Sequence, residues 1–356
     1  MVAESLRGTR GKSSAPNARL TGWIAHGSGA FVELNEPRWQ RSPAGHFHEA
    51  WYLVASEPRA QQGLWIRYTS DCLKQREFAV WGSWFDGQGV FALKSLVPAA
   101  TISRSVEELI AGGCSGEVEA GGHSLRWRLS FGQSGSGEDF IPGWLRLPAK
   151  LRGSGFALAK PATTVTGAVE VDGRMIEFQR VAAGQAHLWG RSRYPAWAWA
   201  RCNAFAEDPD ASIDLLEVVG PGGVRVPMFV LRLRGETHRF CELPWIALTT
   251  SKPAAPAWHF SAQNARLAID GVVHVQPSQM VQVQYEDPDG SFHHCVNSEI
   301  ASMEVRVRSR RFLGARLRPE TTLTSKYGAC LEFCGLNHDE RVQDLLLCSA
   351  RPEETK

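Results

Sequence analysis

Short runs of β-branched and aromatic residues recur along most of this chain. They lie roughly 8–14 residues apart, and clusters of Gly, Pro, Asp and Ser separate them. The clearest runs are residues 51–54, 64–69, 78–85, 90–93, 124–130, 167–174, 224–233, 265–270, 280–285 and 303–310. Such spacing is typical of sheets folded into sandwiches or barrels, so we expect an all-β fold.

Several of these runs alternate between apolar and charged residues. In residues 303–308 the apolar side chains fall on one face of a strand and the charged ones on the other. This pattern indicates half-buried antiparallel strands, since a parallel strand would be apolar throughout. The Asp-Gly pairs at 172–173 and 289–290 are typical of tight hairpins. Only residues 105–110 and 208–216 look helical.

Length and composition favour two structural units. The chain has 356 residues, of which 43% are hydrophobic, and this exceeds one typical domain. Residues 1–18 are polar and rich in Gly and Ser, so we expect a disordered lead-in. Breaks in the strand pattern near 207–211 and 220–223 suggest a boundary, and we place the two units at 19–205 and 206–350.

Charge and motifs exclude several function classes. The 39 Lys and Arg against 37 Asp and Glu give a net charge of +2, which argues against nucleic-acid binding. We find no dinucleotide-binding, phosphate-loop or serine-hydrolase motif in a suitable context, which disfavours those activities. No apolar window approaches the length of a membrane span or of a signal peptide. We therefore expect a cytoplasmic protein.

The cysteines and histidines give weak metal signals. Eight cysteines are scattered along the chain, and the only tight spacing is Cys330-x-x-x-Cys334. With no matching Cys or His pair, buried reduced thiols are favoured over a zinc site. His46 and His48 share a strand face beside Glu49, but no further ligand stands at a defined spacing. We expect no metal.

Residues 187–205 are the segment richest in aromatic side chains. Trp197 and Trp199 would share one face of an extended strand, and Trp189 and Tyr194 lie just before them. Such a face is either part of a plain core or the wall of an apolar ligand pocket. Indole faces can also stabilise a carbocation, which is the chemistry of isoprenoid cyclisation and hydration.

This segment carries a resemblance to a known superfamily. Its residues Trp189-Gly190, Pro195, Trp197-x-Trp199 and Cys202-Asn203-x-Phe205 resemble the tocopherol cyclase signature, and Glu49-x-Trp51-Tyr52 resembles a strand opening of the same group. His187-x-Trp189-Gly190 is similar to a carotenoid 1,2-hydratase motif. Residues 295–301 and 331–333 are similar to the second domain of these proteins. An acidic residue precedes the histidine in hydratases, where this chain has Ala186, and the histidine is not typical of the cyclases.

The resemblance implies a lipocalin-like architecture in two parts. An N-terminal β-sandwich (19–205) and a C-terminal β-barrel (206–350) would enclose an apolar pocket at their junction. Members of the superfamily generally need no cofactor, and a side chain of the pocket supplies or relays a proton. The resemblance thus implies an isomerase or lyase, either a cyclase or a hydratase, acting on a small hydrophobic prenyl, polyene or polyketide substrate.

Candidate site residues follow from these observations. His187 would relay the proton or position the substrate. The candidate acids are Asp214, Glu217 and Glu299, whose pKa an apolar pocket would raise. Asp214 leads, because the alternation in 212–217 aims it inward. The candidate substrate-binding residues are Trp51, Trp189, Tyr194, Trp197, Trp199, Asn203 and Glu299.

Two alternatives remain open. One is a non-catalytic carrier or sensor of lipophilic ligands built on the same pocket, and the other is a pericyclic cyclase that works by substrate folding alone. The identity of the substrate, the oligomeric state and peripheral contact with a membrane are left open as well.

Overall fold

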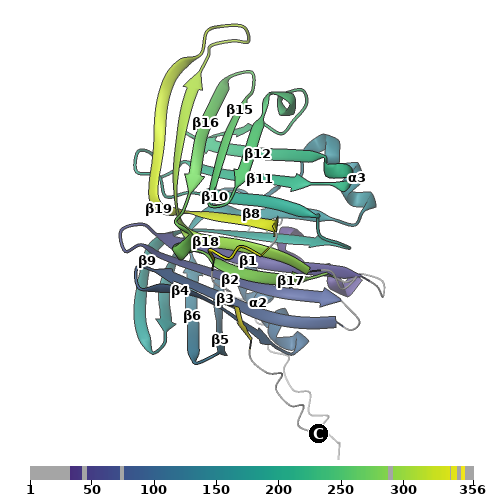
Figure 1. Cartoon of the computed structure of the whole chain (residues 1–356), viewed down its shortest axis with the longest axis vertical. Coiled ribbons are helices and arrows are strands. Elements are labelled where there is room, and N and C mark those ends of the chain that lie inside the picture. Colours follow the sequence, from purple (N-terminus) through teal and green to yellow (C-terminus); the bar gives the residue numbers. More distant parts are fainter. Residues whose placement is uncertain are drawn as a thin grey trace, which may run out of the picture.

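Two large β-sheets make up most of this protein. The computed structural model describes residues 33–41, 46–72, 76–287, 292–336, 338–342 and 346–348. The predicted lead-in at 1–18 and the Asp-Gly pair at 289–290 lie outside the described residues. Within the described part, two ten-stranded sheets lie one above the other, and every strand pairing except β20 with β4 is antiparallel (Figure 1). The predicted all-β, antiparallel fold in two units is confirmed.

The first sheet has the strand order β20-β4-β3-β2-β1-β9-β8-β6-β5, with β7 paired to β8. Its strands are β1 (Phe47–Glu57), β2 (Gln62–Cys72), β3 (Arg76–Asp86), β4 (Gly89–Leu96), β5 (Gly113–Ala120), β6 (His123–Phe131), β7 (Glu138–Asp139), β8 (Gly155–Val171), β9 (Arg174–Gly190) and β20 (Leu346–Cys348). Its short helices are η1 (Trp39–Arg41), η2 (Gly143–Leu145) and α3 (Arg146–Leu151).

One longer helix and one hairpin of the first sheet match the sequence predictions. The helix predicted at 105–110 is part of α2 (Ala99–Ala111), which buries Val106 and Leu109 in the core of this sheet. The Asp-Gly pair at 172–173 joins β8 to β9, and both residues have positive φ, at 49° and 79°. Two successive positive φ values define the hairpin turn that Asp-Gly favours.

The second sheet has the order β13-β12-β11-β10-β19-β18-β16-β15-β14, with β17 paired to β18. Its strands are β10 (Ala196–Cys202), β11 (Ser212–Val219), β12 (Arg225–Leu233), β13 (Glu236–Arg239), β14 (Thr250–Ala254), β15 (Ala257–Gln263), β16 (Leu267–His274), β17 (Val281–Glu286), β18 (Phe292–Ser309) and β19 (Arg318–Leu336). The 3₁₀ helices η3 (Pro221–Gly223), η4 (Trp245–Leu248) and η5 (Pro277–Gln279) lie in its connections.

The helix predicted at 208–216 is wrong. Residues from 212 onward form β11, which pairs with β10 on one side and β12 on the other. Ile213 and Leu215 point into the core of the second sheet, while Leu216 and Val218 point to its opposite face. Ser212 and Asp214 are buried together with Ile213 and Leu215, so the alternation of polar and apolar residues in this strand does not separate an exposed face from a buried one.

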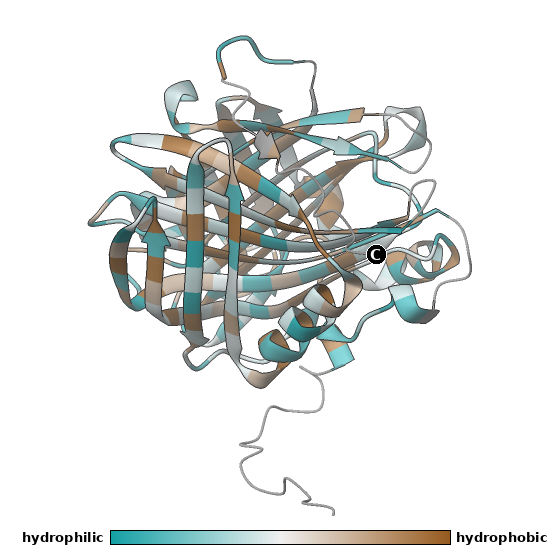
Figure 2. Ribbon diagram, turned by 90° about the horizontal axis from the view of Figure 1, so that it is seen from below, coloured by the Kyte–Doolittle hydropathy of each residue, from teal (hydrophilic) through white to brown (hydrophobic). Residues whose placement is uncertain are grey.

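Three apolar clusters hold the fold together. The first lies within the first sheet and includes Trp51 and Trp84, and the second lies within the second sheet and includes Phe229 and Trp258. The third joins the two sheets, with members such as Trp65 from β2 and residues of β10, β12 and β17. Figure 2 shows hydrophobic and hydrophilic residues following one another along the strands.

The chain moves from the first sheet to the second between Gly190 and Ala196, because β9 belongs to one and β10 to the other. The predicted boundary at 205/206 falls after β10, and the division into domains at that point stays a prediction. The strand β20, at residues 346–348, returns to the first sheet and pairs with β4. The described end of the chain therefore rejoins the sheet in which the described part begins.

The cysteines differ in part from the sequence prediction. Cys295 on β18 and Cys334 on β19 stand opposite each other across the strand pair and form a disulfide, with Cα atoms 4.0 Å apart. The expectation of reduced thiols is therefore wrong at these two positions. The pairing depends on strand register over 39 residues of sequence, which spacing does not reveal. The other six cysteines are free.

Candidate functional site

A cavity of about 360 Å³ lies between the two sheets, and we call it the inter-sheet cavity. Its walls come from β1, β2, β8 and β9 of the first sheet and from β10, β11, β12 and β19 of the second, with the η2–α3 segment at one side. Most of the lining is apolar or aromatic. Its size and lining are those of a small-molecule site.

Strand β10 supplies much of the aromatic wall. Trp197 and Trp199 line the inter-sheet cavity, while Ala198 and Ala200 between and after them pack in the core of the second sheet. This is the two-residue alternation expected of a strand. Across the cavity wall, Tyr52 of β1 meets the edge of Trp199, with ring centroids 5.4 Å apart.

Glycine at the start of β8 brings another indole into the wall. A Cβ at Gly155 would lie 2.1 Å from Cζ2 of Trp189, so only a residue without a side chain lets this indole lie against the strand. Both residues line the inter-sheet cavity. The fit explains why the aromatic segment of β9 faces a glycine on the neighbouring strand.

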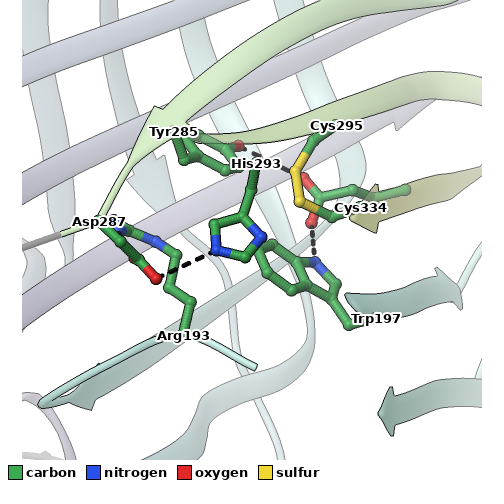
Figure 3. Close-up of a disulfide and its surroundings, with 8 residues drawn as sticks. Arg193, Trp197, Tyr285, Asp287, His293, Cys295 and Cys334 are labelled. Atoms are coloured by element: carbon green, nitrogen blue, oxygen red, sulfur yellow. Dashed lines mark hydrogen bonds and ion pairs between the residues drawn. A yellow bond between two sulfur atoms is a disulfide. The ribbon is translucent and has the colours of Figure 1, made fainter. Parts of the chain in front are cut away.

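A single carboxyl group lines the inter-sheet cavity among the described residues, and it belongs to Glu332 of β19. The β10–β19 register places Glu332 opposite Trp199. The indole Nε1 of Trp197 donates a hydrogen bond to Glu332 Oε1 at 2.6 Å, and the hydroxyl of Tyr285 donates to Oε2 at 3.4 Å. The rings of Trp197 and Tyr285 stack on each other with centroids 6.3 Å apart, close to the disulfide (Figure 3).

Burial sets the protonation of this carboxyl group. Removal from water raises the pKa of Glu332 above its ordinary value, while the two hydrogen bonds and the charge of Arg67 act in the opposite direction. The net shift is upward, so the protonated form is favoured more than in water. A protonated carboxyl group beside indole faces is a potential proton donor.

We call the His48, Arg67, Arg193 and Glu332 part of the cavity lining its polar end, together with Tyr285, which is hydrogen-bonded to Glu332. The guanidinium of Arg67 lies over the ring of Tyr285 at 4.4 Å, and that of Arg193 lies 5.6 Å from the same ring. Burial, followed by the charge of Arg193, lowers the pKa of His48 well below its usual value, which favours the neutral imidazole.

Arg193 forms ion pairs with two carboxylates that are not part of the cavity lining. Its guanidinium pairs with Asp287 at 2.6 Å and with Asp71 at 3.1 Å, and Asp287 also contacts His293 at 3.1 Å (Figure 3). The contacts with Arg193 and His293 lower the pKa of Asp287 to about 2 against the effect of burial. This network links β17 and β18 to the loop before β10.

Four of the predicted site residues meet in one place. Trp189, Tyr194, Trp197 and Trp199 all line the inter-sheet cavity. The predicted pocket segment therefore does border a cavity. Their roles in ligand binding stay predictions.

His187 and Trp51 are not part of the cavity lining, although the ring of His187 lies 4.8 Å from that of the lining residue Trp189. The ring of His187 is fully buried, with Nδ1 2.7 Å from the carbonyl of Leu34 and Nε2 2.8 Å from Glu49. Trp51 stacks on this ring at 4.5 Å and donates from Nε1 to the carbonyl of Asn35. Both residues hold segment 33–41 against β1 and β9, and the catalytic role of His187 stays a prediction.

Asp214 also lies outside the cavity lining, buried in an ion-pair network. Its Oδ2 is 2.6 Å from Nη1 of Arg232 and its Oδ1 is 3.6 Å from Nε of Arg201. Arg232 and Arg239 in turn pair with Glu138 of β7, so the network ties the second sheet to the first. Its catalytic role stays a prediction as well.

Asn203 and Glu299 make contacts between the sheets away from the cavity lining. The amide of Asn203 donates to the carbonyls of Thr163 and Ala183, at 3.1 and 2.9 Å. Glu299 is fully buried, and burial raises its pKa to about 8. A Cβ at Gly63 would lie 2.6 Å from Cβ of Glu299, so glycine on β2 permits the close approach of β18.

Sequence reasoning did not select Glu332, the carboxyl residue of the cavity lining, as a site residue. It stands only within 331–333, a segment that resembles the second domain of the superfamily. One signal was present, because a lone carboxylate interrupts the apolar run of residues 329–334. A charged residue there needs a buried partner or a function.

The described residues contain neither a metal-binding cluster nor a membrane-spanning helix. Among the described residues, no group of three or more His, Cys, Asp or Glu side chains is arranged to hold a metal ion. None of the helices in the described ranges combines the length and the apolar character needed to cross a membrane.

Comparison with known proteins gives a family match and distant relatives. The sequence model described as tocopherol cyclase-like matches residues 125–333, which is more than half of the chain. Uncharacterized proteins of Mycobacterium tuberculosis strains H37Rv and CDC 1551 are each 26% identical over 297 residues, covering 78% of this chain and 85% of the relative.

Three solved structures align with this chain at low sequence identity. A putative AttH protein from Nitrosomonas europaea aligns with a TM-score of 0.47 and 11% identity, over 82% of this chain and 93% of that one. Kievitone hydratase from Nectria haematococca gives 0.48 and 10%, over 89% and 96%. CghA gives 0.49 and 10%, over 87% and 94%.

Proposed function

Because this chain belongs to the tocopherol cyclase-like family, we propose that it is a cyclase or hydratase that works in the inter-sheet cavity. The substrate is a hydrophobic prenyl, polyene or polyketide molecule, and the reaction needs no cofactor. The observation that supports this proposal is one carboxyl group, that of Glu332, with a raised pKa in an aromatic-walled cavity. An acid of this kind starts cyclisation and hydration alike.

The proposed reaction begins with proton transfer from Glu332 to a carbon–carbon double bond. The O–H bond of the carboxyl group breaks, a C–H bond forms, and a carbocation remains on the neighbouring carbon. A hydroxyl group of the substrate, or water, then adds to the cation. The proton that it loses returns to the carboxylate, so that Glu332 ends the cycle protonated.

The contacts of Glu332 suit both halves of this cycle. Burial favours the neutral acid before transfer, and the hydrogen bonds from Trp197 and Tyr285 stabilise the carboxylate that transfer creates. The indole faces of Trp197 and Trp199 can stabilise the cation through their ring quadrupoles. An apolar wall also keeps bulk water from the cation.

The test compares the wild-type protein with Glu332→Gln and with a control. Glu299→Gln is the matched control, because it removes a second buried carboxyl group that lies away from the cavity lining. Each protein is incubated with lipid extract of its host, and bound and released species are identified by native and liquid-chromatography mass spectrometry. We expect the wild-type protein and Glu299→Gln to convert one species, and Glu332→Gln to bind that species unchanged.

The mass of the product separates the reactions. An unchanged mass with a changed retention time indicates cyclisation, and a gain of one water indicates hydration. Equal conversion by Glu332→Gln would refute the role of this residue. A species retained by the wild-type protein without any conversion would instead favour a carrier or sensor of lipophilic ligands.

A further inference from the structure

Arg67 is a buried guanidinium without a carboxylate partner. Its side chain comes from β2, is 6% exposed and lines the inter-sheet cavity. Among the residues that the structure describes it forms no ion pair, and its Nε has no hydrogen-bond partner. Arginine stays charged in proteins, and a buried unpaired charge is costly. Its contact with the ring of Tyr285 offsets only part of that cost.

Two other groups of the cavity lining also have unused hydrogen-bonding atoms. Nδ1 of His48 and Nε1 of Trp199 are buried without a partner among the described residues, and these residues are 5% and 7% exposed. Buried polar atoms are normally paired, so these atoms leave the cavity wall able to bind a polar group. The indole can only donate, and a neutral imidazole can donate from one nitrogen.

The two arginines of this end differ in their partners. Arg193 pairs with both Asp71 and Asp287, while Arg67 forms no ion pair within the described part. Glu332, the one acidic side chain of the cavity lining in the described part, lies close enough for the charge of Arg67 to lower its pKa, but burial outweighs this effect and the net shift is upward. The guanidinium of Arg67 is therefore the charged group of this end with a hydrogen-bond donor to spare.

We propose that the inter-sheet cavity binds an amphipathic organic anion, with its negatively charged oxygen head against Arg67 and its apolar body along Trp197 and Trp199. A carboxylate or an acidic enolate has the chemistry of this head group, because a guanidinium pairs with such oxygens through two parallel hydrogen bonds. This inference rests on the proposed function and adds a substrate class to it. Fixing the head at Arg67 would hold the body of the substrate next to Glu332.

The experiment uses two fluorescent probes with the same apolar frame. 1-Anilinonaphthalene-8-sulfonate carries a permanent negative charge, and N-phenyl-1-naphthylamine is its neutral counterpart. Both are titrated into the full-length wild-type protein and three variants. Arg67→Met removes the unpaired charge, and Arg152→Gln removes an exposed charge that also lines the cavity. Leu216→Trp fills the cavity from β11.

We expect Arg67→Met to weaken binding of the anionic probe by about tenfold or more, as the loss of a charge-assisted contact does. The affinity for the neutral probe should stay within about twofold of wild type, because that probe has no charge to pair with Arg67. Arg152→Gln should change the affinity for either probe little. Arg67→Met should also melt at or above the wild-type temperature, because a buried charge without a partner destabilises the folded state.

Two results would overturn the inference. One is equal affinity of wild type and Arg67→Met for the anionic probe, and the other is an equal loss in Arg67→Met and Arg152→Gln. If the inference on Arg67 is refuted but the neutral probe still binds and Leu216→Trp blocks its binding, the cavity binds apolar ligands and the proposed function is not refuted. If Leu216→Trp affects neither probe, the cavity takes no ligand, and the proposed function fails with the inference.

Discussion

The burial of Glu299, where β18 contacts β1 and β2, can be tested through the pH dependence of the stability of the protein. Its carboxyl group is 1% exposed, Ser56 of β1 donates to its backbone carbonyl, and burial raises its pKa from 4.5 to about 8. In the unfolded chain the group ionises near its ordinary pKa. Between these two values the folded protein keeps a proton that the unfolded chain has lost.

The sign and size of the effect follow from that difference. Because the folded state binds the extra proton, stability from this group is complete below pH 4.5 and falls as pH rises toward about 8. Each pH unit in this window costs about 1.4 kcal/mol, so two units cost about 2.7 kcal/mol. With an unfolding entropy of about 2.1 cal/mol/K per residue, this corresponds to about 4 °C in melting temperature.

The assay compares Glu299→Gln with wild type by thermal melting at about pH 5.5 and about pH 7.5, both inside the window. The variant has no ionisable group at this position. We therefore expect the melting temperature of the variant minus that of wild type to be about 4 °C higher at the upper pH than at the lower one. Glu304→Gln, an exposed carboxyl group on the same strand, should track wild type. A difference between Glu299→Gln and wild type that is the same at both pH values would refute the reasoning.

Two further substitutions test the ion-pair network and the packing around it. Asp214→Asn leaves the buried Arg201 and Arg232 with one carboxylate fewer, and urea unfolding should show a loss of about 3–5 kcal/mol; a loss below about 1 kcal/mol would contradict the network. Gly184→Ala would place a Cβ 1.1 Å from Nη1 of Arg201 and should lower the free energy of unfolding by about 1–3 kcal/mol. Its control is Gly89→Ala, where a Cβ would have no atom within 4 Å, and which should lower it by less than about 0.5 kcal/mol. Similar losses in the two glycine variants would exclude this contact as the cause.

The sequence predicted those features that depend on neighbours along one strand. Alternation in 303–308 indicated an antiparallel strand, and these residues are part of β18. The spacing of Trp197 and Trp199 indicated that both side chains lie on one strand face, and both line the cavity. The helix expected at 208–216 was wrong because the polar residues of β11 are buried as well as the apolar ones, so the residue pattern does not mark an exposed strand face.

The site residues that escaped prediction depend on partners far away in the chain. Glu332 meets Trp197 across 135 residues, and only the β10–β19 register brings them together. The burial of His187 against Glu49 and segment 33–41 likewise follows from tertiary packing. The residue type at such positions suggests chemistry, but strand pairing decides which carboxyl group faces the cavity.

Strands β10, β11 and β12 divide their residues between the two faces of the second sheet. Trp197 and Trp199, and after them positions 216, 218, 226 and 228, face the inter-sheet cavity, while their immediate neighbours fill the core behind it. An engineer could therefore randomise these six positions as one library and change the shape of the cavity while leaving the core side chains of the second sheet intact.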